Sequence, residues 1–152
     1  MHFGRLGRGE LVAALGGIIL AACLFLPWYE TSATNSNAVI DGARGALSGW
    51  QVHPVMRWLL LAAAAAPLIL AWIVIRDHEL SWPRGELTAV VGIAAFGLIS
   101  YSGFLDKPGT PPGEISLQPA FYGAVLGTVL MTVGGATRAS ESERSRKPPG
   151  VL

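Results

Sequence analysis

The sequence predicts an all-α fold, a four-helix transmembrane bundle with both termini in the cytoplasm. Half of the 152 residues (51%) are hydrophobic, only 14% are charged, and the mean hydropathy is +0.47. Water-soluble domains carry about 25% charged residues, so this deficit indicates that lipid surrounds much of the chain. Four long apolar stretches without a charged residue account for the excess of hydrophobic residues. The net charge of +1 gives no electrostatic basis for binding nucleic acid.

The four apolar stretches have the length and chemistry of membrane-spanning helices. A hydrocarbon core about 30 Å thick requires about 20 apolar residues in a helix, whose backbone amides must be bonded within the segment. Residues 1–137 are therefore expected to form one four-span membrane domain, with an outer loop at about residues 29–55. The helices are expected at about residues 10–28, 56–75, 86–105 and 117–137.

The distribution of Lys and Arg predicts the orientation of the spans, because cytoplasmic loops are enriched in these residues. With both termini inside, eight basic residues lie in the cytoplasm and three lie outside. The inner set is Arg5, Arg8, Arg76, Arg84, Arg138, Arg144, Arg146 and Lys147, and the outer set is Arg44, Arg57 and Lys107. Residues 138–152 mix charge with Ser and Pro, so they are expected to be a disordered cytoplasmic tail.

Small residues recur along one face of the fourth expected helix and predict a helix-packing surface. Small side chains let two helices approach closely enough for extensive van der Waals contact. Ala13, Gly17 and Ala21 form a similar stripe on the first expected helix. We expect these faces to contact a partner protein, a second copy of the chain, or the chain's own helices. On the fourth helix the residues are Ala120, Gly123, Ala124, Gly127, Thr128 and Thr132.

Pro67 lies midway along the second expected helix. A proline inside a helix removes one backbone donor and crowds the preceding turn, so we expect a kink at this residue. The kink either provides a hinge or a cavity, or is simply a proline of the kind that membrane helices tolerate.

The first outer loop is the best candidate for a recognition surface, because it is long for a connection between two helices of a bundle. Three aromatic residues at its start or within it, Trp28, Tyr29 and Trp50, are expected to act as anchors. They would either recognise a partner in the cell envelope or form the aromatic belt that membrane proteins place at the lipid headgroups.

A short pattern around this loop resembles small four-span membrane proteins that are common in actinobacteria. The pattern is Leu26-Pro27-Trp28-Tyr29 after the first span, followed by Gly49-Trp50 before the second. The resemblance implies a topology and no activity. Nine of the eleven basic residues are Arg, and Ala and Gly are abundant, which is typical of high-GC bacteria. We therefore expect the protein in a bacterial plasma membrane.

Cys23 is the only cysteine, which excludes a disulfide within the chain and a zinc site built from cysteines. Leu20-Ala21-Ala22-Cys23 has the form of a lipoprotein cleavage site, which would place a lipid on Cys23 and remove the first span. The apolar residues that follow Cys23 favour the alternative, an uncleaved membrane anchor.

The expected function is non-enzymatic, because the apolar stretches 11–26, 58–75, 87–105 and 117–137 contain no charged residue and no catalytic, phosphate-binding or metal-binding motif is recognisable. No cofactor is expected. We expect an integral membrane protein that associates with other membrane proteins or with itself. One alternative is a subunit of a transport assembly for small molecules or lipids, with Ser100, Ser102, Thr128 and Thr132 along the path. Another is a subunit of a lipid-handling enzyme, which requires Glu30, Asp41 and His53 to converge.

Overall fold

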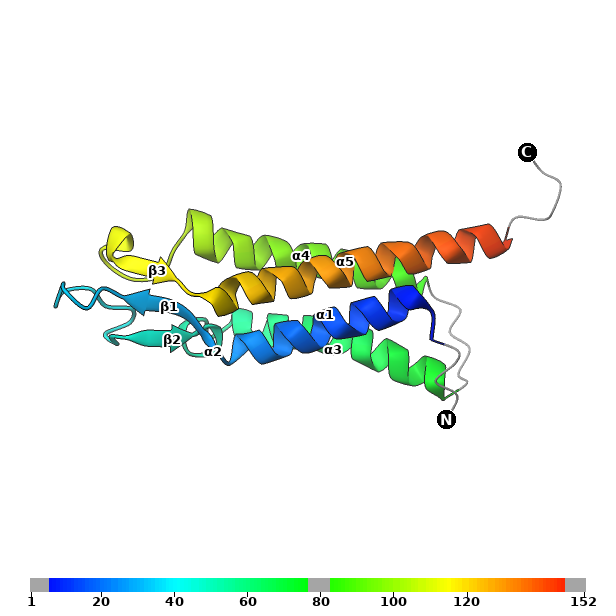
Figure 1. Ribbon diagram of the computed structural model, residues 1–152, viewed down its shortest axis with the longest axis horizontal. Coiled ribbons are helices and arrows are strands. Elements are labelled where there is room, and N and C mark those ends of the chain that lie inside the picture. The colour runs from blue at the N-terminus through cyan, green and yellow to red at the C-terminus, as the bar shows by residue number, and fades with distance from the viewer. Residues whose placement is uncertain (1–5, 77–82, 147–152) are drawn as a thin grey trace.

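Four long helices lie side by side in the computed structural model, and a small β-sheet covers one end of them (Figure 1). The structure describes residues 6–76 and 83–146. We call the end of the helices that carries the sheet the sheet end, and the opposite end, beyond which α5 extends, the tail end. The long helices are α1 (Arg8–Leu24), α3 (Met56–Ile75), α4 (Arg84–Ser100) and α5 (Pro119–Arg146).

Three helical segments in the described part of the chain are long and apolar enough to cross a membrane. They are residues 56–75, 84–105 and 119–142. The second of them includes η2 (Tyr101–Leu105), a π-helical turn that continues α4. The expected helices at residues 56–75 and 86–105 are thus confirmed as apolar helices of membrane-spanning length. α1 has 17 residues and is shorter than these three segments.

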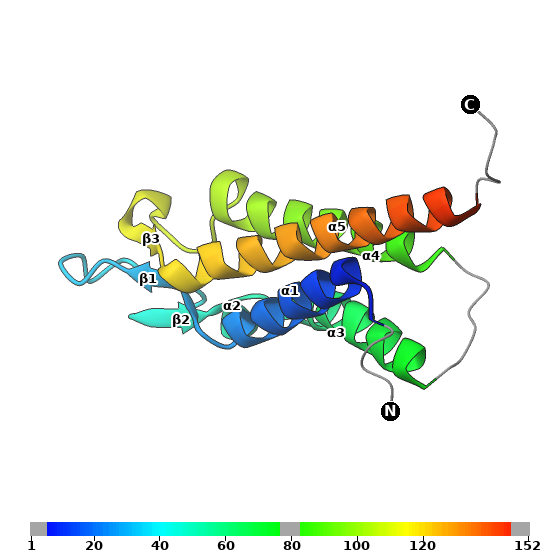
Figure 2. The same cartoon turned by 45° about the vertical axis from the view of Figure 1, so that its right-hand side comes forward.

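The central helix of the arrangement is α5, which packs along α1 on one side and along α4 on the other (Figures 1 and 2). α3 packs mainly against α1 and makes a less extensive contact with α4. The four helices therefore form a ring in which α5 is tightly packed against both of its neighbours, whereas the contact between α3 and α4 is loose.

The sheet corrects the expectation of a purely helical fold. It has the order β2-β1-β3 and is antiparallel throughout, with β1 (Pro27–Thr31), β2 (Ala46–Ser48) and β3 (Ile115–Leu117). Tyr29 in the central strand faces Leu47 on one side and Leu117 on the other. The first helix consequently ends at Leu24 rather than near residue 28, and the fourth begins at Pro119. Pro27 has no amide proton to continue a helix, and the aromatic pair after it favours a strand.

The segment between β1 and β2 folds back on itself through a tight turn. Asp41 and Gly42 both have positive φ, 49° and 79°, and the flanking residues Ile40 and Ala43 exchange two backbone hydrogen bonds. This pattern is a two-residue hairpin turn, for which Asp-Gly is a preferred sequence. A short helix, α2 (Gly49–Val52), then leads from β2 toward α3, and the 3₁₀ turn η3 (Pro112–Glu114) precedes β3.

The expected disordered tail is partly wrong, because α5 continues as a helix to Arg146. The extension is held by a tertiary ion pair, in which Nε of Arg138 lies 3.2 Å from a carboxylate oxygen of Glu10 on α1. Glu141, one turn further along, lies 4.0 Å from the same arginine. Residues 147–152 of the expected tail lie outside the described residues.

Pro67 is accommodated within α3, which is helical on both sides of it. The proline is buried and packs against α1, where a Cβ on Gly17 would lie 2.9 Å from its ring and 2.5 Å from the carbonyl oxygen of Ala64. The function of Pro67 in this structure is therefore interhelical packing, and the expected kink stays a prediction.

Candidate functional site beneath the sheet

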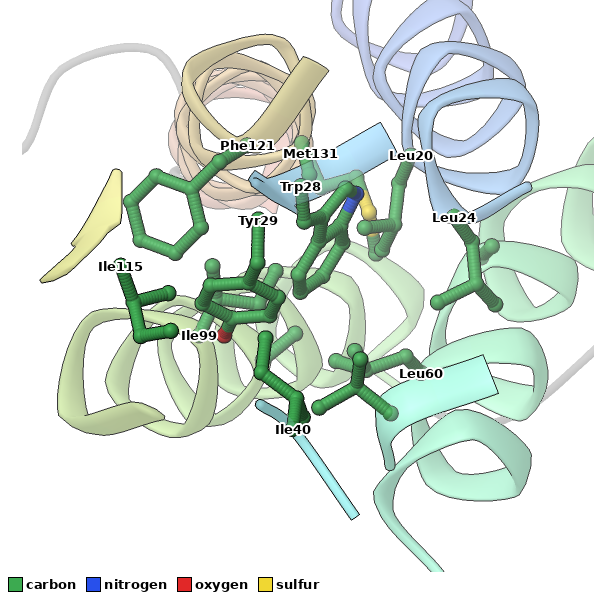
Figure 3. Close-up of a cluster of buried hydrophobic side chains, with 14 residues drawn as sticks. Leu20, Leu24, Trp28, Tyr29, Ile40, Leu60, Ile99, Ile115, Phe121 and Met131 are labelled. Carbon is green, nitrogen blue, oxygen red and sulfur yellow. The ribbon is translucent and has the colours of Figure 1, made fainter. Parts of the chain in front are cut away.

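The best-defined site in the described residues is a buried group where the sheet meets the helices. We call it the junction cluster, and it consists of Trp28, Tyr29, His53, Ser102 and Phe121. Figure 3 shows Trp28 and Tyr29 at its centre, with Phe121 above and Ile40 below. Trp28, Tyr29 and Phe121 are all 0% exposed. The cluster joins residues from β1, the segment after α2, η2 and α5 into one packed unit.

The burial of Trp28 and Tyr29 corrects the prediction that these side chains form a recognition surface. Both side chains pack against residues of the helices and are fully buried, so they cannot reach a partner. Aromatic residues near the end of a membrane span are typical of the lipid interface, and that signal is the same whether the ring faces lipid or the core.

Trp28 is held in place by one hydrogen bond and by a glycine. Its indole Nε1 donates to the carbonyl of Cys23 at 2.7 Å, at the end of α1. A Cβ on Gly49 would lie 2.6 Å from the indole ring, so only glycine fits at this point of α2. The ring of Phe121 meets the indole edge to face, with centroids 5.7 Å apart. Two residues of the pattern noted in the sequence, Trp28 and Gly49, are therefore direct contact partners.

Tyr29 connects the sheet to α4 through its hydroxyl group. The hydroxyl oxygen lies 3.0 Å from Nε2 of His53 and 3.3 Å from both the carbonyl and the hydroxyl oxygen of Ser102. The Ser102 hydroxyl itself donates to the carbonyl of Ile99. A tyrosine hydroxyl has a single proton, so when it donates to Ser102 the hydrogen of the His53 contact must come from Nε2.

The π-helical turn η2 supplies the acceptor for Tyr29. The amide of Asp106 donates to the carbonyl of Tyr101 at 2.9 Å, whereas an α-helix would direct it to the carbonyl of Ser102. The Ser102 carbonyl is thereby left available for the tyrosine. Single π-helical turns are rare in proteins. Those that occur are often found at functional sites, because they re-aim backbone groups in this way.

Burial keeps both titratable groups of the junction cluster neutral near pH 7. It raises the pKa of Tyr29 to about 12, an effect that the hydrogen bond to Ser102 partly opposes. It lowers the pKa of His53 to about 4, and the negative charge of Asp41 partly opposes that shift. Neither group is tuned to exchange protons near neutral pH, as a general acid or base must be.

Of the three residues that a lipid-handling enzyme would require, Asp41 lies close enough to His53 for its negative charge to act on the pKa of the imidazole, whereas Glu30 is bonded elsewhere. A carboxylate oxygen of Glu30 accepts a hydrogen bond from Gln118 at 2.7 Å on the exposed side of the sheet. His53 faces inward and is bonded to Tyr29. Among the described residues there is no group of three or more His, Cys, Asp and Glu side chains that could hold a metal ion.

The hydroxyl groups proposed for a transport path are mostly bonded to their own helices. Ser102, Thr128 and Thr132 donate to the carbonyls of Ile99, Val125 and Thr128, respectively. Ser102 and Thr128 are buried, and the hydroxyl oxygen of Ser100 is buried without a hydrogen-bond partner in the described structure.

The small-residue faces are used for packing within the chain. A Cβ on Gly127 would lie 2.8 Å from the carbonyl oxygen of Gly16 on α1, and Ala124 and Thr128 beside it are 0% exposed. A Cβ on Gly123 would meet only Sγ of Cys23, at 2.7 Å. Ala120 and Ala21 are partly buried against the core, and Thr132 fills the space that a side chain on Gly92 would need.

The stripe on the first helix is divided between two neighbours. Ala13 packs against Gly134 of α5, whereas Gly17 packs against α3. Two further glycine contacts were not singled out in the sequence, Gly9 with Gly134 and Gly85 with Gly135. The adjacent pair Gly134-Gly135 was the sequence feature that could have indicated these contacts. Adjacent glycines lie on different faces of a helix, however, so they do not form the stripe of small residues that predicts helix packing.

Trp50 is the one expected anchor that remains partly exposed. It packs between Phe25 and Trp58, with its ring centroid 5.0 Å and 5.1 Å from theirs. The guanidinium of Arg57 lies 5.0 Å from the centroid of the same indole and donates to its backbone carbonyl at 3.3 Å. This group has the composition of a membrane-interface belt.

A groove runs between α3 and α4, and we call it the α3–α4 groove. It consists of two adjoining hollows of about 340 and 390 Å³ that share Ala66 and Val91. The hollow nearer the sheet end is lined mainly by alanines from both helices, and the other reaches Arg84 at the tail end. Only 17% of α3 is buried in the protein, against 33% and 39% of the other two candidate spans.

Comparison with protein-family models, with curated proteins and with solved structures gives no match to this chain.

Proposed function

We propose that the chain is a non-enzymatic, four-span integral membrane protein of a bacterial plasma membrane that associates with another envelope protein through its sheet end. The fourth span is α1. Its 17 residues extend about 26 Å, close to the thickness of a hydrocarbon core. Its buried residues run from Gly9 to Leu24, against α3 and α5, so it lies along the other helices over its full length.

The positions of the charges support an orientation with the sheet end outside. Arg44, Arg57 and Lys107 belong to the sheet end, and the more numerous basic residues belong to the tail end and the segments beyond it. An excess of Lys and Arg on one side predicts that this side is cytoplasmic. Both termini would then be cytoplasmic.

The observation that carries the proposal is the fixed attachment of the sheet to the helices by the junction cluster. A loop that merely connects two spans needs neither a three-stranded sheet nor a fully buried Trp and Tyr. A sheet held in this way presents the exposed, mostly polar segments 32–37 and 41–45 in one orientation. A pre-organised surface loses less conformational entropy when a partner binds than a mobile loop does.

Site-specific photocrosslinking in native membranes tests the proposal. A photoreactive residue at Ser36, which is exposed in the hairpin, is expected to capture a heterologous protein at fixed stoichiometry. The same residue at Ser140, exposed on α5 beyond the tail end, is the matched control and should not capture that protein. The variant Tyr29→Phe, which loosens the attachment of the sheet, should reduce the yield at Ser36 without reducing the amount of protein in the membrane.

Three results would count against the proposal. Capture of only the same chain at Ser36 indicates a homo-oligomer, and no capture indicates that the sheet is a passive connection. The topology is tested separately in a Cys23→Ala background, where Cys at position 36 should react with an impermeant reagent in intact cells and Cys at position 140 should not. Labelling of both positions contradicts the four-span arrangement.

The α3–α4 groove favours a second candidate function, a subunit that handles lipids within the membrane. Its apolar lining and its open volume distinguish it from the tightly packed contacts of α5 with α1 and α4.

A further inference from the structure

The α3–α4 groove has the dimensions of a narrow apolar ligand. Along α4 it extends from Arg84 to Leu98, about 21 Å at the helical rise per residue. An extended hydrocarbon chain is a narrow apolar ligand of this kind.

The lining of the groove changes from purely apolar to cationic at one end. The hollow nearer the sheet end is lined by Ala62, Ala63, Ala66, Ala94 and Ala95 together with branched apolar side chains. At the tail end the lining includes Arg84. Shallow alanine walls leave space that larger side chains would have filled. The groove therefore offers an apolar channel that ends at a positive charge.

Arg84 has no ion-pair partner among the described residues. Arg138, the neighbouring arginine on α5, is paired with Glu10 at 3.2 Å. Within residues 6–76 and 83–146, no carboxylate lies within ion-pair distance of Arg84. The nearby Thr88 hydroxyl donates to the backbone carbonyl of Arg84. The side chain of Arg84 is thus free to pair with an anion at the membrane surface.

We propose that the α3–α4 groove binds an anionic phospholipid, with one acyl chain along the groove and the phosphate paired with Arg84. The proposal rests on the membrane placement described above but not on any protein partner of the sheet end. Basic residues at the cytoplasmic ends of membrane helices, beside an apolar groove between them, are the chemistry that recognises anionic headgroups. The lipid would complete the loosely closed side of the helix ring and hold α3 and α4 together.

Lipid titration of the full-length protein in detergent, followed by native mass spectrometry, tests this inference. The probes are phosphatidylglycerol and phosphatidylcholine with identical acyl chains. The wild-type protein is expected to bind one phosphatidylglycerol about fivefold more tightly than phosphatidylcholine, the effect of one basic residue near an anionic headgroup. Arg84→Gln should abolish this preference. Arg8→Gln removes an exposed arginine at the start of α1, which also lies at the tail end. This variant should leave the preference for phosphatidylglycerol unchanged.

Filling the groove provides a second, independent test. Ala66→Phe or Ala94→Phe, on opposite walls, should reduce the binding of both lipids. Ala136→Phe, at an exposed position of α5, is the matched control and should not. Circular dichroism on each variant verifies that the helices are intact, and Ala94→Phe serves if Ala66→Phe does not fold.

Two results would overturn the inference. Equal headgroup preference in wild type and Arg84→Gln shows that Arg84 does not bind the phosphate, and equal lipid binding by the groove variants and Ala136→Phe shows that the lipid lies elsewhere. Loss of the partner crosslink at Ser36 with intact lipid binding would contradict only the proposed function of the sheet end.

Discussion

Gly49 and Trp28 are in contact so close that a methyl group on Gly49 would lie 2.6 Å from the indole ring. The indole cannot move aside, because it is fully buried and its Nε1 is bonded to the carbonyl of Cys23. The position of α2 under the sheet therefore depends on the absence of a side chain at one residue.

Gly49→Ala is accordingly expected to destabilise the protein by about 1–3 kcal/mol, the usual cost of overpacking a core. Gly97→Ala is the matched control, because Gly97 lies in α4 and a Cβ there meets nothing within 4 Å. Replacing an unconstrained helical glycine by alanine should stabilise the helix by about 0.5–1 kcal/mol. Thermal unfolding in detergent, followed by circular dichroism, compares the two. A loss of stability in Gly97→Ala equal to that in Gly49→Ala would refute the steric explanation.

The two glycines of the Gly123-x-x-x-Gly127 motif are expected to differ in their tolerance of alanine. At Gly127 the added carbon would meet backbone atoms of Gly16 and Leu20, at 2.8 and 2.9 Å, which cannot move without separating α1 from α5. At Gly123 it would meet only the thiol of Cys23, a side chain that can rotate away. Gly127→Ala should lower the unfolding temperature clearly more than Gly123→Ala does. Similar losses in both variants would indicate that the motif acts as a whole rather than through one close contact.

Tyr29→Phe should destabilise the protein by about 1–3 kcal/mol, because it leaves buried hydrogen-bonding groups of Ser102 and His53 without a partner. Tyr101→Phe removes the same hydroxyl from an exposed residue of the adjacent turn and should change stability little. Chemical unfolding of both variants in the same detergent gives the comparison. If Tyr29→Phe unfolds like the wild type, the hydroxyl contributes nothing to the junction cluster.

The stability of the folded protein should decrease with acidification through the titration of His53. The unfolded chain protonates this residue below about pH 6.5, whereas burial keeps the folded protein from doing so until the pH nears 4. The stabilisation is therefore fully present above pH 6.5 and is lost as the pH falls through this window. The difference in unfolding temperature between wild type and His53→Gln should shrink from pH 7.5 to pH 4.5. A difference independent of pH would exclude this role.

Cys23 is expected to remain unmodified, with α1 still attached. Cleavage before Cys23 would remove the helix that packs against both α3 and α5, including the contact of Gly16 with Gly127. Intact-mass measurement of the protein purified from membranes should give a chain beginning at Met1 without an acyl group. A mass that corresponds to an acylated chain starting at residue 23 would contradict the assignment of α1 as a span.

The sequence predicts the long helices well, because hydrophobicity and length act along a continuous segment. The second expected helix, residues 56–75, agrees with α3 at both ends, and the third differs from the observed segment only at its start. The sheet was not predictable in the same way. Its outer strands have three residues each, and their pairing with β1 joins segments that are far apart in the sequence.

The sequence identified two residues of the candidate site, Trp28 and Tyr29, but not the arrangement of their side chains in space. Trp28 and Tyr29 were singled out by their type and by their position after the first span. Whether they faced a partner or the core depended on the pairing of β1, which no local pattern reveals. Asp41-Gly42 was the available signal for a hairpin in this region. The extension of α5 was missed for a related reason, because the ion pair of Arg138 with Glu10 is a tertiary contact.

The short connections at the sheet restrict how the helices can move. β1 follows α1 after only Phe25 and Leu26, and β3 precedes α5 by only Gln118, whose amide donates to the carbonyl of Trp28. Sliding of α1 past α5 would shear the hydrogen bonds between β1 and β3. These two helices therefore move together as one rigid unit. Any rearrangement of the helices within the bilayer must then occur at the loosely packed contact between α3 and α4, where these two helices can separate.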